Sequence, residues 1–89
     1  MKIKEIINKA KKEIEKYENY IICCNKNKTL TNLSKSFVCI LHNEFCCSTW
    51  NDIYCFIKKN TTFEFNSSKT IQDNINDFIK SYNTQLEVE

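Results

Sequence analysis

The sequence predicts a small α+β domain with two layers, in which a short antiparallel sheet packs on N- and C-terminal helices. Two observations support this prediction. Apolar residues recur at helical spacing near both ends of the chain, and the apolar run within residues 52–66 fits a hairpin. The 89 residues suffice for one domain, residues 1–89, and the hydrophobic fraction of 42% is typical of a globular protein.

Both ends of the chain are predicted to be helical. Apolar residues at alternating spacings of four and three, starting at Ile3, predict a helix over about residues 2–19. A similar pattern near the other end predicts a helix over about residues 70–83, with Thr70 as its N-cap. We expect the tail from Thr84 to Glu89 to be frayed.

Two further elements are predicted between the terminal helices. A short β-prone run at about residues 20–24 precedes a polar turn, which predicts a strand. Residues 31–45 are compatible with a buried strand over Ser36–Leu41, but their apolar spacing is also helical. The helix is favoured because the pattern persists for about fifteen residues and because Thr31 is a suitable N-cap.

Residues 52–66 are predicted to form the hairpin of the sheet. Asn60 tolerates the left-handed conformation that a two-residue turn at Lys59-Asn60 requires. In this register the aromatic side chains form two cross-strand pairs on one face: Tyr54 with Phe65, and Phe56 with Phe63. We therefore expect these four rings to lie in the interior, between the sheet and the terminal helices.

The composition excludes several classes of function. The chain contains no glycine, so a glycine-rich phosphate loop is excluded, and turns that need positive φ are expected to use asparagine or aspartate. The chain also has no arginine, which excludes bidentate recognition of phosphate or guanine. No apolar stretch is long enough to span a membrane.

The six cysteines are predicted to be reduced. The charged N-terminus lacks the apolar region of a signal peptide, so we expect a cytoplasmic protein, in which disulfides are rare. Cys39, His42 and Cys46 fall near one face if residues 31–45 are helical, and with a fourth cysteine they would form a zinc site. The favoured interpretation is that buried cysteines act as small apolar residues, so no cofactor is expected.

No group of residues has the spacing of a catalytic site, and we predict that the protein is not an enzyme. The expected function is that of a small protein-binding module, an inhibitor or an adaptor. An origin in a phage or another mobile element, as for anti-CRISPR-like anti-defence proteins, fits a composition typical of AT-rich coding. The expected contact surface consists of lysines on the first helix and on the hairpin: Lys4, Lys11, Lys12, Lys58 and Lys59.

Alternative functions remain open at this point, one of which is a small-ligand pocket between a helix and the sheet. The lysine-rich N-terminal half is compatible with nucleic-acid binding, which would weaken steeply as salt rises. A zinc-stabilised interaction module is another alternative. A homodimer is also compatible with the pattern, because Ile53, Cys55 and Ile57 fall together on the second face of the predicted sheet.

Overall fold

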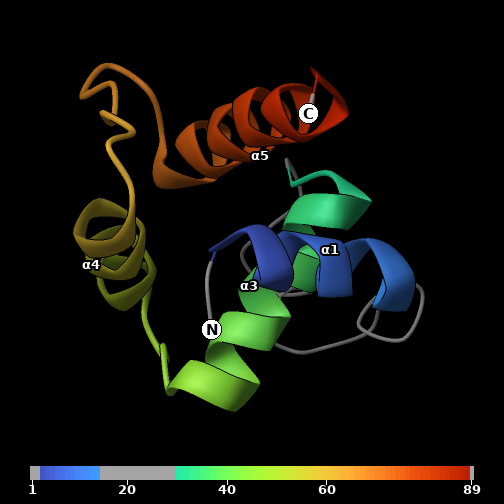
Figure 1. Cartoon of the computed structure of the whole chain (residues 1–89). Helices are drawn as coiled ribbons and strands as arrows, with labels where there is room; N and C mark the ends of the chain where they lie inside the picture. The colour runs from blue at the N-terminus through green and yellow to red at the C-terminus, as the bar shows by residue number, and fades with distance from the viewer. Residues whose placement is uncertain (1–2, 15–29, 89) are drawn as a thin grey trace.

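The computed structural model describes residues 3–14 and 30–88, with side chains as far as residue 82, and helices joined by loops are the regular structure of this part of the chain (Figure 1). Its elements are α1 (Ile3–Glu13), α3 (Asn32–Phe45), α4 (Trp50–Asn60) and α5 (Ile71–Val88). No strand or sheet occurs among the described residues. The predicted α+β fold is therefore wrong, and the predicted strand at about residues 20–24 lies outside the described residues.

The core forms where α1 packs against α3, and α5 contacts both of these helices. A hydrogen bond ties the first pair together, since Ser36 Oγ donates to the carbonyl oxygen of Ala10 over 3.1 Å. At the surface Lys9 Nζ lies 2.7 Å from a carboxylate oxygen of Glu44. The predicted helix at about residues 2–19 is present as α1 up to Glu13, and its remainder falls largely outside the described residues. The core side chains come from every described helix: Ile3, Ile6, Ile7, Ala10, Leu30, Phe37, Val38, Cys39, Ile40, Leu41, Cys47, Ile53, Ile57, Ile75, Phe78 and Ile79.

Helix α3 occupies the range predicted for a helix at residues 31–45. The Thr31 hydroxyl caps it by accepting a hydrogen bond from the Ser34 backbone N–H over 3.2 Å. The helix ends at Cys46, which takes the left-handed conformation with φ of 57°. Cys46 is the residue with positive φ in the described part of the chain, so the expectation that asparagine or aspartate would take this role is wrong there.

Helix α4 replaces the first strand of the predicted hairpin. The Asp52 backbone N–H donates to Thr49 Oγ1 over 3.1 Å, and the Thr49 N–H donates to the Asp52 carboxylate over 3.2 Å. This reciprocal capping box starts a helix at Trp50. Ile53 and Ile57 lie one turn apart on its buried face, and both are fully buried. Local capping and this helical face therefore override the strand propensity of the apolar run.

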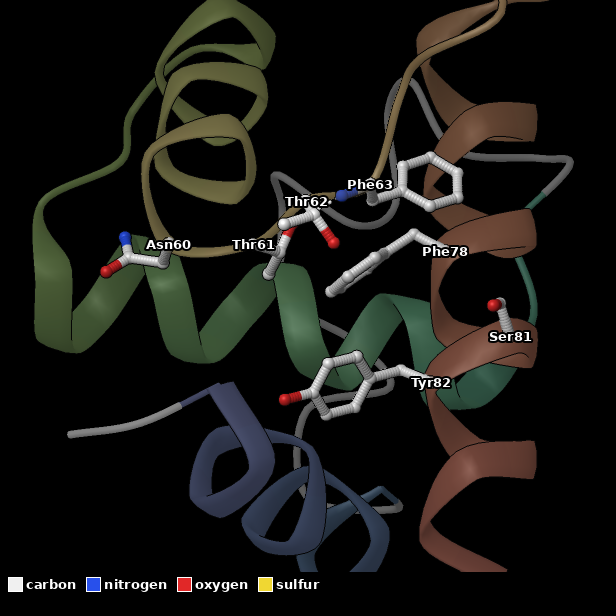
Figure 2. Close-up of a pocket in the computed structure, with 7 residues that line it drawn as sticks. All are labelled: Asn60, Thr61, Thr62, Phe63, Phe78, Ser81 and Tyr82. Atoms are coloured by element: carbon white, nitrogen blue, oxygen red, sulfur yellow. Dashed lines mark hydrogen bonds between the residues drawn. The ribbon is translucent and has the colours of Figure 1, made fainter.

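Residues 61–66, called here the return segment, reverse the chain direction after α4 and pass between α4 and α5 (Figure 2). Thr61 begins the segment in an extended conformation, and its N–H donates to the Ile57 carbonyl over 2.9 Å. Of the two predicted aromatic pairs, Tyr54 and Phe65 are in contact, with ring centroids 4.5 Å apart. The second pair is not observed, because Phe56 packs on Phe45 and Phe63 packs on Phe78.

Helix α5 starts where the sequence predicted but ends later. Its start agrees, because the Asp73 backbone N–H donates to Thr70 Oγ1 over 3.1 Å. Its end does not, because the helix continues to Val88, beyond the predicted end at about residue 83. No helix in the described part of the chain combines the length and apolar character needed to cross a membrane.

Candidate binding surface at the return segment

An open pocket of about 330 Å³ lies between the end of α4, the return segment and α5. In Figure 2 the rings of Phe63 and Phe78 lie next to each other, and Tyr82 follows one turn further along α5. The pocket combines aromatic walls with short polar side chains that can donate or accept hydrogen bonds. Its lining residues are Asn60, Thr61, Thr62, Phe63, Phe78, Ser81 and Tyr82.

A second open pocket, of about 340 Å³, lies between the return segment and the outer turns of α4. Lys58 Nζ lies 5.7 Å from the centroid of the Tyr54 ring in this pocket, which is a cation–π contact. Glu64 also lines the pocket, so its two charged side chains have opposite signs. The full lining is Tyr54, Lys58, Phe63, Glu64 and Phe65.

Phe63 separates the two pockets and belongs to a continuous series of ring contacts. Its centroid lies 5.6 Å from that of Phe65 and 5.3 Å from that of Phe78, both in edge-to-face geometry. Phe78 continues the series to Tyr82, 5.6 Å away, and is itself 1% exposed. The half-buried rings of the return segment are therefore held against a fully buried one, which gives both pockets a fixed wall.

The far end of the return segment is fastened by the buried amide of Asn74. Asn74 Oδ1 accepts from the Asn66 N–H over 2.7 Å, and its Nδ2 donates to the Asn66 carbonyl over 3.0 Å. The same Nδ2 also lies 2.9 Å from the carbonyl oxygen of Thr70. Asn74 is 3% exposed, and these bonds satisfy its polar atoms in the interior. With Thr61 bound at the other end, the segment is anchored on both sides.

The chemistry of the first pocket suits binding. Apart from the phenol of Tyr82, its side-chain polar groups are neutral hydroxyls and an amide from Asn60, Thr61, Thr62 and Ser81. Such groups form hydrogen bonds but do not exchange protons readily near neutral pH, so they are poor general acids or bases. What this surface offers is aromatic contact area with hydrogen-bonding groups around it.

The structure does not gather the five predicted contact lysines into one surface. Lys4, Lys11 and Lys12 are exposed on α1, whereas Lys58 and Lys59 are exposed in the last turn of α4. In the view of Figure 2, α3 lies between these two helices. The predicted lysine surface is thus divided between two separate elements, and Lys58 alone among these five lines the aromatic pockets.

The predicted zinc ligands do not form a site among the described residues, where no group of three or more potential metal ligands occurs. Cys39 is fully buried and disulfide-bonded, and its partner is not one of the free cysteines Cys46, Cys47 and Cys55. A disulfide sulfur is not a thiolate, the form that binds metal. The expectation of reduced cysteines is therefore wrong at Cys39, while Cys46 is an exposed free thiol and His42 is partly buried.

The residues expected to form a dimer interface do not share one face, because they lie in a helix. In a strand Ile53, Cys55 and Ile57 would share one face, but in α4 the two isoleucines are fully buried while Cys55 is exposed. These residues therefore do not form a common exposed surface.

The free thiol of Cys47 is buried. This burial, followed by the charges of Asp52 and Cys46, raises the pKa of the thiol.

Comparison of the chain with family models, curated proteins and solved structures finds no match. Sequence reasoning identified Phe63 and Phe65 as part of an aromatic cluster but missed Ser81 and Tyr82. The alternation of exposure along the return segment was visible in the sequence as alternating polar and apolar residues. The contribution of α5 depends on tertiary packing and had no comparable local signal.

Proposed function

We propose that the protein is a non-catalytic protein-binding module of the inhibitor or adaptor type, and that the pockets on either side of Phe63 receive side chains of its partner. The observation that supports this proposal most is the fixed row of partly exposed rings lining two open pockets. Aromatic side chains placed in this way lose little conformational entropy on binding, and they are enriched among residues that dominate binding energy.

Charge favours a protein partner over a nucleic acid. Lys58 lines the second pocket together with the acidic Glu64, and the lining of the first pocket contains no basic residue. Phosphate binding needs several cations that act together, and neighbouring carboxylates oppose it. Proteins that bind single-stranded nucleic acid usually combine aromatic stacking with a positively charged groove. Within the described residues, the aromatic surface lacks such a positive charge.

The cytoplasmic location and the phage or mobile-element origin stay predictions. The disulfide at Cys39 counts against the first of these, because stable disulfides are typical of oxidising compartments. Rapid acid quenching of native cells, followed by alkylation of free thiols under denaturing conditions and mass spectrometry, tests the location, because Cys39 is buried in the folded protein. Cytoplasmic protein would carry the alkyl label on Cys39, whereas protein from an oxidising compartment would not.

A photo-crosslinking experiment tests the proposed binding surface. A benzophenone amino acid replaces Ser81, an exposed residue of α5 that lines the first pocket. The matched control carries the same amino acid at Asn43, an exposed helical position on α3 that lines neither pocket. We expect a discrete crosslinked protein in native cells from position 81 and not from position 43.

Substitution at the same two positions provides the second arm of this test. Ser81→Arg places a long charged side chain at the pocket, and Asn43→Arg makes the same charge change elsewhere. Partner recovery should fall at least tenfold for Ser81→Arg and remain unchanged for Asn43→Arg, with equal thermal unfolding of both variants. Equal recovery of the partner by both variants would exclude the pocket as the contact surface.

A further inference from the structure

The second pocket contains a carboxylate that the described residues leave without a partner. Glu64 is exposed and lines the pocket, but its carboxylate forms no hydrogen bond or ion pair with any described residue. The carboxylates of Glu44 and Asp77 differ in this respect, because each of them lies 2.7 Å from a lysine Nζ. The Glu64 carboxylate is therefore still able to pair with a cation from another molecule.

The lysine of the same pocket does not neutralise this carboxylate. Lys58 Nζ lies over the face of the Tyr54 ring, 5.7 Å from its centroid. No ion pair joins Lys58 to Glu64 in the described part of the chain. Lys58 is thus held at the negative face of an aromatic ring, which attracts cations. The pocket therefore combines one cation that is engaged at Tyr54 with a carboxylate that can accept another.

The aromatic walls of the second pocket stand nearly at right angles to their neighbours. The ring planes of Tyr54 and Phe65 are inclined by 89°, and those of Phe65 and Phe63 by 81°. All three rings are partly exposed and line the pocket. A side chain that enters this pocket therefore meets aromatic surface on more than one side, together with the Glu64 carboxylate.

We propose that the second pocket binds an arginine side chain of the partner protein, with its guanidinium paired to Glu64 and stacked on the aromatic walls. This inference rests on the proposed function and names the group that the partner contributes. A guanidinium is planar and weakly hydrated, so it stacks on rings and pairs with a carboxylate through two parallel N–H···O bonds. A pocket of about 340 Å³ is at the small end of ligand sites, which suits one side chain.

Other occupants fit the second pocket less well. A lysine ammonium is a compact and strongly hydrated charge that lacks the planar fork of arginine. A phosphate or a carboxylate would be repelled by Glu64. A second copy of these 89 residues cannot supply the side chain, because they contain no arginine. Charge and ring geometry therefore favour an arginine from a different protein.

NMR titration of the purified chain with N-acetyl-arginine methylamide tests this inference. The matched probe is N-acetyl-citrulline methylamide, because citrulline has nearly the same shape without the charge. At constant ionic strength the arginine probe should shift the ring resonances of Tyr54 and Phe65. It should bind about threefold more tightly than the citrulline probe, which is the gain expected from one exposed ion pair. Equal affinities, or shifts confined to residues outside the second pocket, would overturn the inference.

Substitution of the two charged residues identifies the group responsible. Glu64→Gln should remove the preference for arginine over citrulline. Glu5→Gln makes the same charge change at an exposed position on α1 that lines neither pocket, and it should preserve the preference. Lys58→Gln should tighten arginine binding about twofold, because a like charge leaves the pocket. A preference that survives in Glu64→Gln, or weaker arginine binding by Lys58→Gln, would contradict the assignment.

Crosslinking in native cells separates this inference from the proposed function. Glu64→Gln, combined with the benzophenone amino acid in place of Ser81, should lower the yield of crosslinked partner about threefold. Glu5→Gln in the same background should leave the yield unchanged. Equal yields from both would support the proposed function and overturn the arginine inference. The absence of any crosslinked partner would overturn the proposed function, whereas the titration with the arginine probe needs no partner and still decides whether the pocket selects arginine.

Discussion

Two regions of this protein are stabilised by different interactions. In the first, α1 and α3 pack with α5 through fully buried aliphatic side chains, among them Ile7, Ile40 and Leu41. In the second, α4 anchors itself to the same core through Ile53 and Ile57, and capping hydrogen bonds and edge-to-face contacts between partly exposed rings hold the rest of α4 and the return segment. The comparison indicates a division of roles, because the buried region supplies stability whereas the second region exposes groups that are still able to bind.

Truncation of a core side chain should give the largest difference in free energy of unfolding between the two regions. Phe37→Ala removes a fully buried ring from α3 and should lower the free energy of unfolding by about 3–5 kcal/mol. Phe65→Ala removes a partly buried ring from the return segment and should cost less than half as much, because less apolar area leaves water there. Urea unfolding followed by circular dichroism measures both values. Equal losses would show that the two regions do not differ in this respect.

Reduction of the Cys39 disulfide is expected to have the next largest effect, and it acts on the buried region. Loss of a native disulfide typically lowers stability by about 2–4 kcal/mol, so the urea midpoint should fall when a phosphine reductant is added. Cys55→Ser provides the control, because Cys55 is an exposed free thiol and its replacement should leave the midpoint unchanged. An unchanged midpoint in the reduced protein would contradict the assignment of a stabilising disulfide.

Removing the Asn74 amide should loosen the second region selectively. Asn74→Ala leaves the Asn66 N–H without its 2.7 Å acceptor, and stability should fall by about 1–3 kcal/mol. The Asn66 amide should also exchange faster, while amides in the middle of α3 keep their protection relative to global unfolding. Asn76→Ala is the matched control on the same helix, since the Asn76 side chain accepts from the Thr31 N–H instead. Similar exchange of the Asn66 amide in both variants would argue against the fastening role.

The smallest expected effect concerns the start of α4 and its pH dependence. The backbone N–H of Thr49, followed by its side chain, donates to the Asp52 carboxylate and lowers its pKa below 3.8. The lowered pKa stabilises the folded state above pH 3.8, and this contribution is lost as the pH falls through the folded-state value. Carbon-detected NMR titration should give an Asp52 midpoint below 3.8, and Thr49→Ala, which removes the hydroxyl but keeps the backbone N–H, should return it part of the way toward that value. A midpoint that Thr49→Ala leaves unchanged would contradict the contribution of the Thr49 hydroxyl to the lowered pKa.

The sequence was sufficient to predict helices near residues 3, 31 and 71, because each has a long apolar stripe and two have a hydroxyl cap. It was misleading in the middle of the chain. Ile53 to Ile57 is continuously apolar, so a period of two and a helical period fit it equally well. The deciding signal was the capping box formed by Thr49 and Asp52, which precedes the ambiguous run.

The candidate site could be predicted only in part for a related physical reason. Tyr54 and Phe65 lie close together in a hairpin and equally in a helix followed by a returning chain, so their contact survives the error in fold. The position of Phe63 depends on where α5 packs, and a pattern within residues 52–66 carries no information about that. Ser81 and Tyr82 were missed for the same reason, since their role depends on a distant segment.

The aromatic partner of Phe63 tests the central claim most directly. NMR of the protein with selectively labelled phenylalanine rings reports which rings lie within about 5 Å of each other, the centroid spacing common for packed aromatic pairs. We expect nuclear Overhauser effects between Phe63 and Phe78, together with sequential amide contacts along α4. Contacts between Phe63 and Phe56, with cross-strand contacts in place of the helical ones, would show a hairpin and contradict both the fold and the binding surface described for it.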